Sequence, residues 1–254
     1  MTTRREFLAM AGHVGAASAI TLFAVRVNAQ GVEYKATNVV DGGTISGRAR
    51  LAGKSPDPDR IIIGKDNHVC GEGHATHDAV LVDADGGLAN TVVTLKGIAA
   101  GRAWPGGEVP SITQEKCAFH PYVQVAPKDA ELTIHNKDPL LHNIHAYELI
   151  GRARRTLFNI AQPQAGQVDK HKLELRRGNV VEIDCDAHNW MSAWVFISEH
   201  PYAVVTDQAG RFELTAIPPG AYELSAWHPV LGTTAVPVKV SRKAKTTADV
   251  AFAG

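Results

Sequence analysis

Short runs in which apolar and polar residues alternate recur along nearly the whole chain. Residues 44–51 alternate with a period of two, and residues 89–95 are rich in the β-branched side chains that favour strands. Glycine (23 residues) and proline (13 residues) separate these runs, and few windows carry the repeat of about 3.6 residues that marks an amphipathic helix. Residues 150–160 are the one segment in which we expect a short helix or an irregular crossover. The sequence therefore predicts an all-β protein.

The N-terminus has the features of an export signal. The run that begins at Thr3 reads Thr-Arg-Arg-Glu-Phe-Leu, the twin-arginine pattern, and an alanine-rich apolar stretch follows over residues 9–25. A small-x-small cleavage site ends at Ala29, so we expect residues 1–29 to be a twin-arginine-type signal peptide. The apolar stretch is short and broken by glycine, which argues against a membrane anchor. The mature protein is expected to be soluble in the periplasm or another extracytoplasmic compartment.

The charge balance argues against a nucleic-acid partner. The whole chain has 26 basic and 26 acidic residues, and removal of residues 1–29 takes away three arginines and one glutamate. The remaining 23 basic and 25 acidic residues give a formal net charge of −2. Nucleic-acid binding needs a clustered basic surface instead. We therefore expect no nucleic acid among the partners.

A group of metal-binding residue types occupies one short segment. Cys185, His188 and Met191 are spaced C-x2-H-x2-M, and His142 stands upstream within His-Asn-Ile-His. Thiolate and thioether ligands favour copper, and two imidazoles complete the trigonal set with a weak axial methionine that is found in mononuclear blue-copper sites. The other two methionines of the chain lie in the expected signal peptide. These residues thus predict one mononuclear copper ion held by His142, Cys185, His188 and Met191.

The other two cysteines are expected to have a separate role. With Cys185 as the metal thiolate, Cys70 and Cys117 remain as a disulfide pair, which suits an oxidising compartment. An alternative is a second metal site in the stretch that holds Cys70 together with His68, His74 and His77. Cys70 is better used in the disulfide, and histidine-rich loops are frequently only loops.

Residues 109–199 resemble the cupredoxins at several points in the right order. Residues 117–121 (Cys-Ala-Phe-His-Pro) are similar to the family's F-x-P element, and residues 136–138 (Asn-Lys-Asp) match the N-x-D that precedes its first ligand histidine. The spacings C-x2-H-x2-M and H-N-x-H are most like those of the amicyanin-like members. The resemblance implies a Greek-key cupredoxin β-sandwich, with His142, Cys185 and His188 as equatorial ligands and Met191 as the axial one.

Residues around the ligands are expected to have roles as well. The resemblance implies that Asn143 ties the two ligand loops together by hydrogen bonds. Trp190, with Trp194 just beyond it, would shield the metal or form a docking surface. His188 lies in a short loop near the expected surface, so we expect its imidazole to reach solvent.

Residues 200–254 resemble the carboxypeptidase-regulatory or transthyretin-like β-sandwich repeat. Two runs between residues 206 and 224 carry this resemblance, whereas the strands that normally open such a repeat lie far upstream, before residue 94. One hypothesis is that the copper domain, residues 109–199, is inserted into a sandwich whose halves are residues 30–108 and 200–254. Two consecutive sandwiches are the alternative. In both cases this additional β-sandwich module implies structure or binding, because no catalytic constellation is visible in it.

Three functions are compatible with these features. The first is an exported type 1 (blue) copper protein that exchanges electrons with a redox partner protein. The second is a periplasmic copper-binding or copper-delivery protein, which copper exchange rates would distinguish from a carrier. The third is a β-sandwich module that binds carbohydrate or protein. No Ser-His-Asp pattern stands out and the paired cysteines of a binuclear copper centre are missing, so the chain is not expected to be an enzyme.

Overall fold

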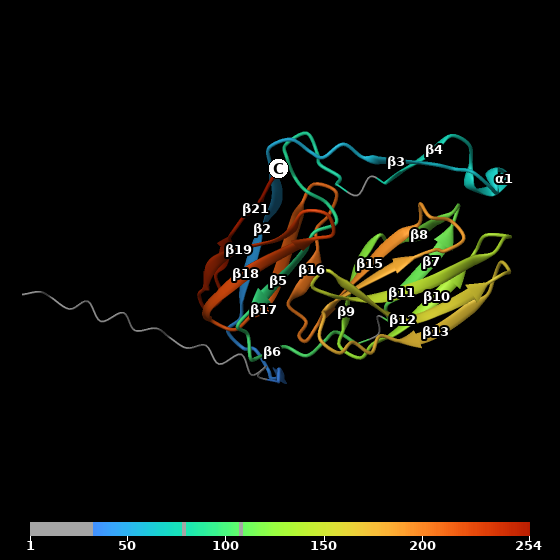
Figure 1. Cartoon of the computed structure of the whole chain (residues 1–254). Coiled ribbons are helices and arrows are strands. Elements are labelled where there is room, and N and C mark those ends of the chain that lie inside the picture. Colours follow the sequence, from blue (N-terminus) through green and yellow to red (C-terminus); the bar gives the residue numbers. More distant parts are fainter. Residues whose placement is uncertain (1–32, 78–79, 107–108) are drawn as a thin grey trace, which may run out of the picture. The chain divides into compact units, whose positions relative to one another are not determined.

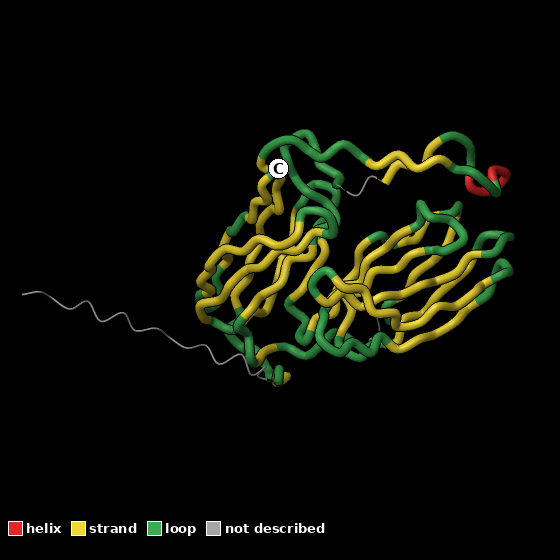
Figure 2. The backbone as a smooth tube through the Cα atoms, viewed as in Figure 1, coloured by secondary structure: helices red, strands yellow, loops and turns green. Residues whose placement is uncertain are grey.

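The computed structural model describes residues 33–77, 80–106 and 109–254, and the expected signal peptide, residues 1–29, lies outside them. In the described part nearly all regular structure is strand, and the only helix there is the four-residue α1 (Asn67–Cys70) (Figures 1 and 2). The all-β prediction is confirmed. Within the same residues, no helix combines the length and the apolar character that are needed to cross a membrane.

Residues 150–160, expected as a short helix or a crossover, belong to a β-hairpin instead. The chain runs along β11 (His142–Ile150), turns at Gly151 and returns along β12 (Ala153–Gln162). Gly151 has a φ of 62°, the left-handed conformation that glycine adopts without steric penalty. The expectation was wrong because the helix preference of single residues is weak, and cross-strand pairing with β11 overrides it.

The first sandwich carries the predicted metal ligands. One of its sheets has the strand order β13-β10-β7-β8, and the other has the order β12-β11-β14-β15-β9. The pairs β7–β10 and β9–β15 are parallel and join strands that are not consecutive, so the chain crosses between the sheets in Greek-key fashion. Besides β11 and β12, its strands are β7 (Ser111–Glu115), β8 (Ala118–His120), β9 (Val123–Pro127), β10 (Glu131–Asn136), β13 (Val168–Lys172), β14 (Val180–Asp184) and β15 (Ser192–Ser198).

Period-two alternation decides which side chains reach the core of this sandwich. In β10, Leu132 and Ile134 are fully buried while their neighbours are not. In β14, Val181 and Ile183 are fully buried, and Cys185 continues the same inner face just beyond the end of the strand. Burying each large aliphatic side chain stabilises the fold by about 1.5–3 kcal/mol. The apolar face that holds the sheets together therefore also carries Cys185 into the interior.

The second sandwich is built from strands that lie on both sides of the first in the sequence. One sheet has the order β16-β5-β18-β19, and the other has the order β17-β2-β20, with β21 also paired to β2. Because β2 and β5 precede the first sandwich and the others follow it, the first sandwich is inserted between two halves of the second. The strands are β2 (Gly43–Ala52), β5 (Val92–Lys96), β16 (Ala203–Val205), β17 (Arg211–Ile217), β18 (Gly220–His228), β19 (Gly232–Val240), β20 (Lys245–Thr247) and β21 (Val250–Ala253).

Four short strands complete the described structure. β1 (Lys35–Ala36) pairs in parallel with β6 (Ala100–Gly101). β3 (Asp59–Ile62) and β4 (His74–His77) form an antiparallel pair with α1 between them, and we call residues 60–75 the arm. The predicted disulfide is formed: Cys70 of the arm is bonded to Cys117 after β7, with their Cα atoms 5.1 Å apart across 47 residues of sequence.

Candidate metal centre

Three of the predicted ligands lie in one tight loop between β14 and β15. The N–H of His188 donates to the carbonyl of Cys185 (3.2 Å), and the N–H of Met191 donates to the carbonyl of His188 (2.9 Å). The N–H of Cys185 donates in turn to the carbonyl of Met191 (3.3 Å). These backbone bonds close the loop on itself, so the side chains that it carries are held in fixed positions.

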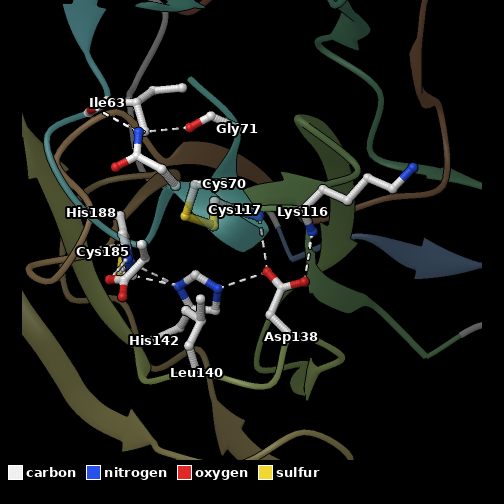
Figure 3. Close-up of a disulfide and its surroundings, with 12 residues drawn as sticks. Ile63, Cys70, Gly71, Lys116, Cys117, Asp138, Leu140, His142, Cys185 and His188 are labelled. Carbon is white, nitrogen blue, oxygen red and sulfur yellow. Dashed lines mark hydrogen bonds and ion pairs between the residues drawn. A yellow bond between two sulfur atoms is a disulfide. The ribbon is translucent and has the colours of Figure 1, made fainter. Parts of the chain in front are cut away.

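His142 reaches the same place from the start of β11. This strand is antiparallel to β14, and their register brings His142 level with the ligand loop. His142 Nδ1 lies 3.0 Å from His188 Nδ1 and 3.8 Å from Cys185 Sγ, and this sulfur lies 3.7 Å from His188 Nδ1 (Figure 3). None of the three residues is more than 2% exposed. We call His142, Cys185 and His188 the donor cluster, because their ligand atoms converge on one buried point.

Carboxylates hold the far nitrogen of each imidazole. His142 Nε2 lies 2.8 Å from Asp138 Oδ2, and His188 Nε2 lies 3.0 Å from Asp66 Oδ2. An ionised carboxylate can only accept a hydrogen bond, so each ring carries its proton on Nε2. The lone pair of each ring is therefore on Nδ1, which faces the cluster, as in metal sites whose histidines are oriented by carboxylates.

Asp138 is itself anchored to the backbone. It is 4% exposed and accepts the N–H groups of Lys116 (2.7 Å) and Cys117 (2.9 Å). Burial opposes its ionisation, but these donors together with the imidazole of His142 outweigh that effect and hold the pKa of Asp138 below its ordinary value. The carboxylate is thus ionised and fixed, and it orients His142.

The chemistry of the donor cluster fits a soft or borderline metal cation. Burial lowers the pKa of His142, although the hydrogen bond that the ring donates to Asp138 acts in the opposite direction, so the ring stays neutral and keeps its lone pair. Burial also raises the pKa of the Cys185 thiol, so its thiolate needs a cation nearby. Two nitrogen lone pairs and a sulfur that face one another are mutually repulsive unless a cation lies among them. Copper and zinc are the ions that this combination of thiolate and imidazole suits.

Asn143 joins β11 to the ligand loop. Its Oδ1 accepts the N–H of Ala187 (3.2 Å) and lies 3.4 Å from the sulfur of Cys185. Its Nδ2 donates to Asn159 (2.8 Å) and to Asp186 (2.9 Å). The amide is therefore fixed from both sides and lies between the two ligand-bearing segments, where the resemblance to cupredoxins put it.

The ring of Trp190 lies edge-on to His188, with the ring centroids 5.1 Å apart. Met191 is buried in the same apolar core as Cys185. Trp194, which with Trp190 was expected either to shield the metal or to form a docking surface, faces the other way. It lies on the outer face of β15, and its ring packs against Trp227 with centroids 6.0 Å apart. Trp194 therefore does not shield the donor cluster.

The expectation that His188 reaches solvent is wrong. The residue is 1% exposed, because Trp190 lies against its ring and Asp66 covers its outer nitrogen. Position in a short surface loop suggests exposure, but the arm, whose Asp66 precedes His188 by 122 residues, folds over this loop.

The alternative of a second metal in the histidine-rich stretch gains no support from the described side chains. Cys70 is used in the disulfide. Among the described residues, neither His68 nor His74 belongs to a cluster of converging ligand atoms. The side chain of His77 lies outside the described part.

Sequence reasoning does not identify the two carboxylates of the site. Asp138 has a local signal, because it ends the Asn-Lys-Asp motif and precedes His142 by four residues. Asp66 has none: it lies in a polar stretch, and it contacts His188 across 122 residues of sequence. The sequence shows the pattern of ligand residues. Of the two carboxylates that orient these ligands, it signals only Asp138.

Comparison with known proteins finds similarity only to solved structures, since no family model and no curated relative matches the chain. The purple cupredoxin from Nitrosopumilus maritimus is 22% identical with a TM-score of 0.30, and the match covers 35% of this chain and 99% of that one. A reduced Cu(I) form of an amicyanin variant is 13% identical with a TM-score of 0.29, covering 42% and 98% of the two chains.

A third structure is a copper-containing nitrite reductase from Thermus scotoductus SA-01, at 13% identity and a TM-score of 0.28. That match covers 37% of this chain and only 23% of the reductase, so the chain spans about a quarter of that enzyme. Each of these three matches covers less than half of this chain.

Proposed function

We propose that the protein is an exported copper protein that binds one copper ion at His142, Cys185, His188 and Met191 and transfers electrons between partner proteins. The observation that supports this function is the convergence of one sulfur and two Nδ1 atoms, 3.0–3.8 Å from one another, in a cluster that is at most 2% exposed. Two imidazoles and a thiolate with a weak axial methionine are the donor set of blue-copper sites.

The surroundings of the donor cluster suit electron transfer. Copper, when bound, would supply a one-electron couple. Asp138 and Asp66 fix the two rings, and the closed backbone of the ligand loop fixes Cys185. Fixed donors need little rearrangement when the charge at the site changes, and the apolar core around them excludes water, which tunes the potential.

The enclosure of the cluster argues against a copper-delivery role. A delivery protein must release its ion readily to an acceptor, whereas here all three donor residues are buried and both rings are held by carboxylates. The rate at which copper passes to an excess of a strong chelator separates the two functions. Slow release supports a carrier, and release as fast as mixing would favour delivery.

Metal titration with visible spectroscopy tests the proposed function. The metal-free protein should bind one equivalent of copper(II) and develop an intense visible band from thiolate-to-copper charge transfer. Zinc is the control, because it suits the same donors but gives no such band. A protein that binds no copper, or binds it without this band, would contradict the proposal.

The exchange of Met191 for leucine tests the axial role. An axial thioether contributes weakly to holding the ion but tunes its reduction potential. Met191→Leu should therefore still bind one copper ion, keep the visible band and show a higher reduction potential than the wild type. Potentiometric titration followed at the visible band measures the shift. Loss of copper from this variant would show that Met191 holds the ion rather than tunes it.

Residues 1–29 and 200–254 support two further parts of the proposal. The twin-arginine pattern of residues 1–29 supports export to the periplasm, where the partner would be a redox protein. The resemblance of residues 200–254 to carboxypeptidase-regulatory sandwiches supports a binding or structural role, with carbohydrate or protein as the ligand. The proposal assigns no enzymatic reaction to the chain.

A further inference from the structure

The outer edge of His188 is covered by a segment from a distant part of the chain. Its Nε2 lies 3.0 Å from Asp66 Oδ2 on the arm. The side chain of Asp66 is 37% exposed while that of His188 is 1% exposed, so the carboxylate lies between the ring and solvent. The burial of His188 therefore depends on how the arm is held.

The arm is seated on the first sandwich. Asp66 has a left-handed backbone (φ 53°, ψ 31°), and its carbonyl accepts the N–H groups of Val69 and Cys70, both at 2.9 Å. This single helical turn fixes the position of Asp66 relative to Cys70. Apolar side chains of the arm, among them Ile63, Val69 and Ala75, pack against the core that contains Cys185.

One disulfide connects the supports of both histidines. Cys70 is bonded to Cys117, whose N–H donates to Asp138 Oδ2 (2.9 Å), the same oxygen that contacts His142 Nε2. The two sulfur atoms and a ring nitrogen of His188 all lie within 4.8 Å of one another. Figure 3 shows the disulfide beside the donor cluster, with Asp138 on the opposite side of His142 from Cys185.

We propose that the arm is a cover over the donor cluster, that the Cys70–Cys117 disulfide latches it closed, and that Asp66 is the positioning residue that holds His188 beneath it. Two consequences follow. The latch limits access of reagents to the Cys185 thiol in the metal-free protein, and it limits the rate at which copper enters and leaves. Only the second consequence rests on the proposed copper function.

The first test measures the reactivity of Cys185 in the metal-free protein with Ellman's reagent. Cys185 is the one cysteine outside the disulfide, so the wild type has a single reactive thiol. The double variant Cys70→Ala/Cys117→Ala also has a single thiol, which makes the two rates directly comparable. We expect the double variant to react about tenfold faster or more, because the cover opens locally instead of staying latched.

The control for this test is a variant that is destabilised without loss of the latch. Removing a disulfide lowers the stability of the whole fold, which by itself increases global opening. Glu148→Ala is this control. The buried side chain of Glu148 forms hydrogen bonds with Arg155 and with the backbone of residues 176–178, and none of these groups belongs to the arm. Equal acceleration of Cys185 in Glu148→Ala and in the double variant would overturn the proposal, since access would then follow global unfolding.

Asp66→Ala keeps the disulfide and supplies an independent variant if the double variant does not fold. Loss of the carboxylate should accelerate the reaction of Cys185, and Asp66→Asn, which keeps an acceptor oxygen, should restore part of the protection. Glu72→Gln is the matched control, because Glu72 is an exposed carboxylate on the same arm. A rate in Asp66→Ala equal to that in Glu72→Gln would exclude Asp66 as a positioning residue.

The second test follows copper release to an excess of chelator in the same variants. Groups that orient metal ligands typically change metal affinity by about 10–100-fold, so Asp66→Ala and the double variant should release copper faster by a factor in that range. The copper function and the role of the arm as a cover can fail independently, and the two failures give different results. Latch-dependent reactivity of Cys185 in a protein that binds no copper would refute the copper function and leave the cover intact. Copper binding with latch-independent reactivity and release would refute the cover alone.

Discussion

Replacing Cys185 by serine is expected to abolish the visible absorption of the copper-loaded protein completely. The band requires a thiolate that is bonded to copper, and Cys185 is the one thiol outside the disulfide. A serine hydroxyl at this position is a hard donor that is not ionised at neutral pH, so it can neither give the charge transfer nor match the affinity of the sulfur. Visible spectra and metal analysis after addition of one equivalent of copper(II) measure both effects.

The control for Cys185→Ser replaces a histidine that lies in the same sandwich but outside the donor cluster. His135 lies on β10, and among the described residues it belongs to no cluster of converging ligand atoms. His135→Ala should therefore keep the full band, whereas His142→Ala should weaken or lose it. Survival of the band in Cys185→Ser would show that another group supplies the charge transfer and would overturn the ligand assignment.

Replacing Glu148 by alanine is expected to lower the free energy of unfolding by about 3–5 kcal/mol, the cost of breaking a buried charged network. Glu148 is fully buried in β11. Its Oε1 accepts the N–H groups of Arg176 (2.8 Å), Arg177 (2.7 Å) and Gly178 (2.7 Å), and its Oε2 accepts from Arg155 Nε (2.7 Å). Alanine removes the acceptor of three partly buried N–H groups and the partner of Arg155. Urea denaturation of the two proteins gives the difference.

Glu131→Ala is the control for this prediction. Glu131 also belongs to the first sandwich, but it is 48% exposed and its oxygen lies 3.6 Å from Lys170 Nζ. Exposed ion pairs contribute about 0–1 kcal/mol, so this variant should unfold almost like the wild type. A loss in Glu148→Ala no larger than in Glu131→Ala would show that water replaces the missing carboxylate.

Glu148 also gives the stability a predictable dependence on pH. Burial opposes its ionisation, but the N–H groups of residues 176–178 and Arg155 outweigh that effect and lower its pKa from 4.5 to about 2. A group whose pKa is lowered by folding stabilises the fold fully above its unfolded pKa and loses that contribution as pH falls through the folded pKa. The wild type should therefore lose stability between pH 4.5 and 2. Glu148→Ala should show a shallower decline over the same interval, and parallel declines would contradict the assignment.

The ligand loop was predictable because its information is local. Cys185, His188 and Met191 lie in one loop, and period-two alternation of β14 is enough to point Cys185 inward. The disulfide was predictable from the count of cysteines once Cys185 had a separate role. These inferences use only residue spacing and composition, which can be read without knowledge of the fold.

What could not be predicted depends on contacts between distant segments. Asp66 reaches His188 across 122 residues, and nothing in its neighbourhood distinguishes it from Glu72, the other acidic residue of the arm. The exposure of His188 was misjudged for the same reason. The hairpin at residues 150–160 was missed because its strand character comes from pairing with β11 and not from its own residues.

The insertion of one sandwich into the other links their folding. Thr94 of β5 pairs with Ala203 of β16, so the ends of the insert meet as neighbours on adjacent strands. While the insert is unfolded, this pairing closes a loop of about a hundred residues, which costs about 4 kcal/mol of chain entropy. When the insert is already folded, its two ends are held close together. The second sandwich then forms without this loss of chain entropy. An ion that stabilises the insert would therefore also stabilise strands that contact none of its ligands, and a chain with a misfolded insert would leave two half-sandwiches with unpaired strand edges.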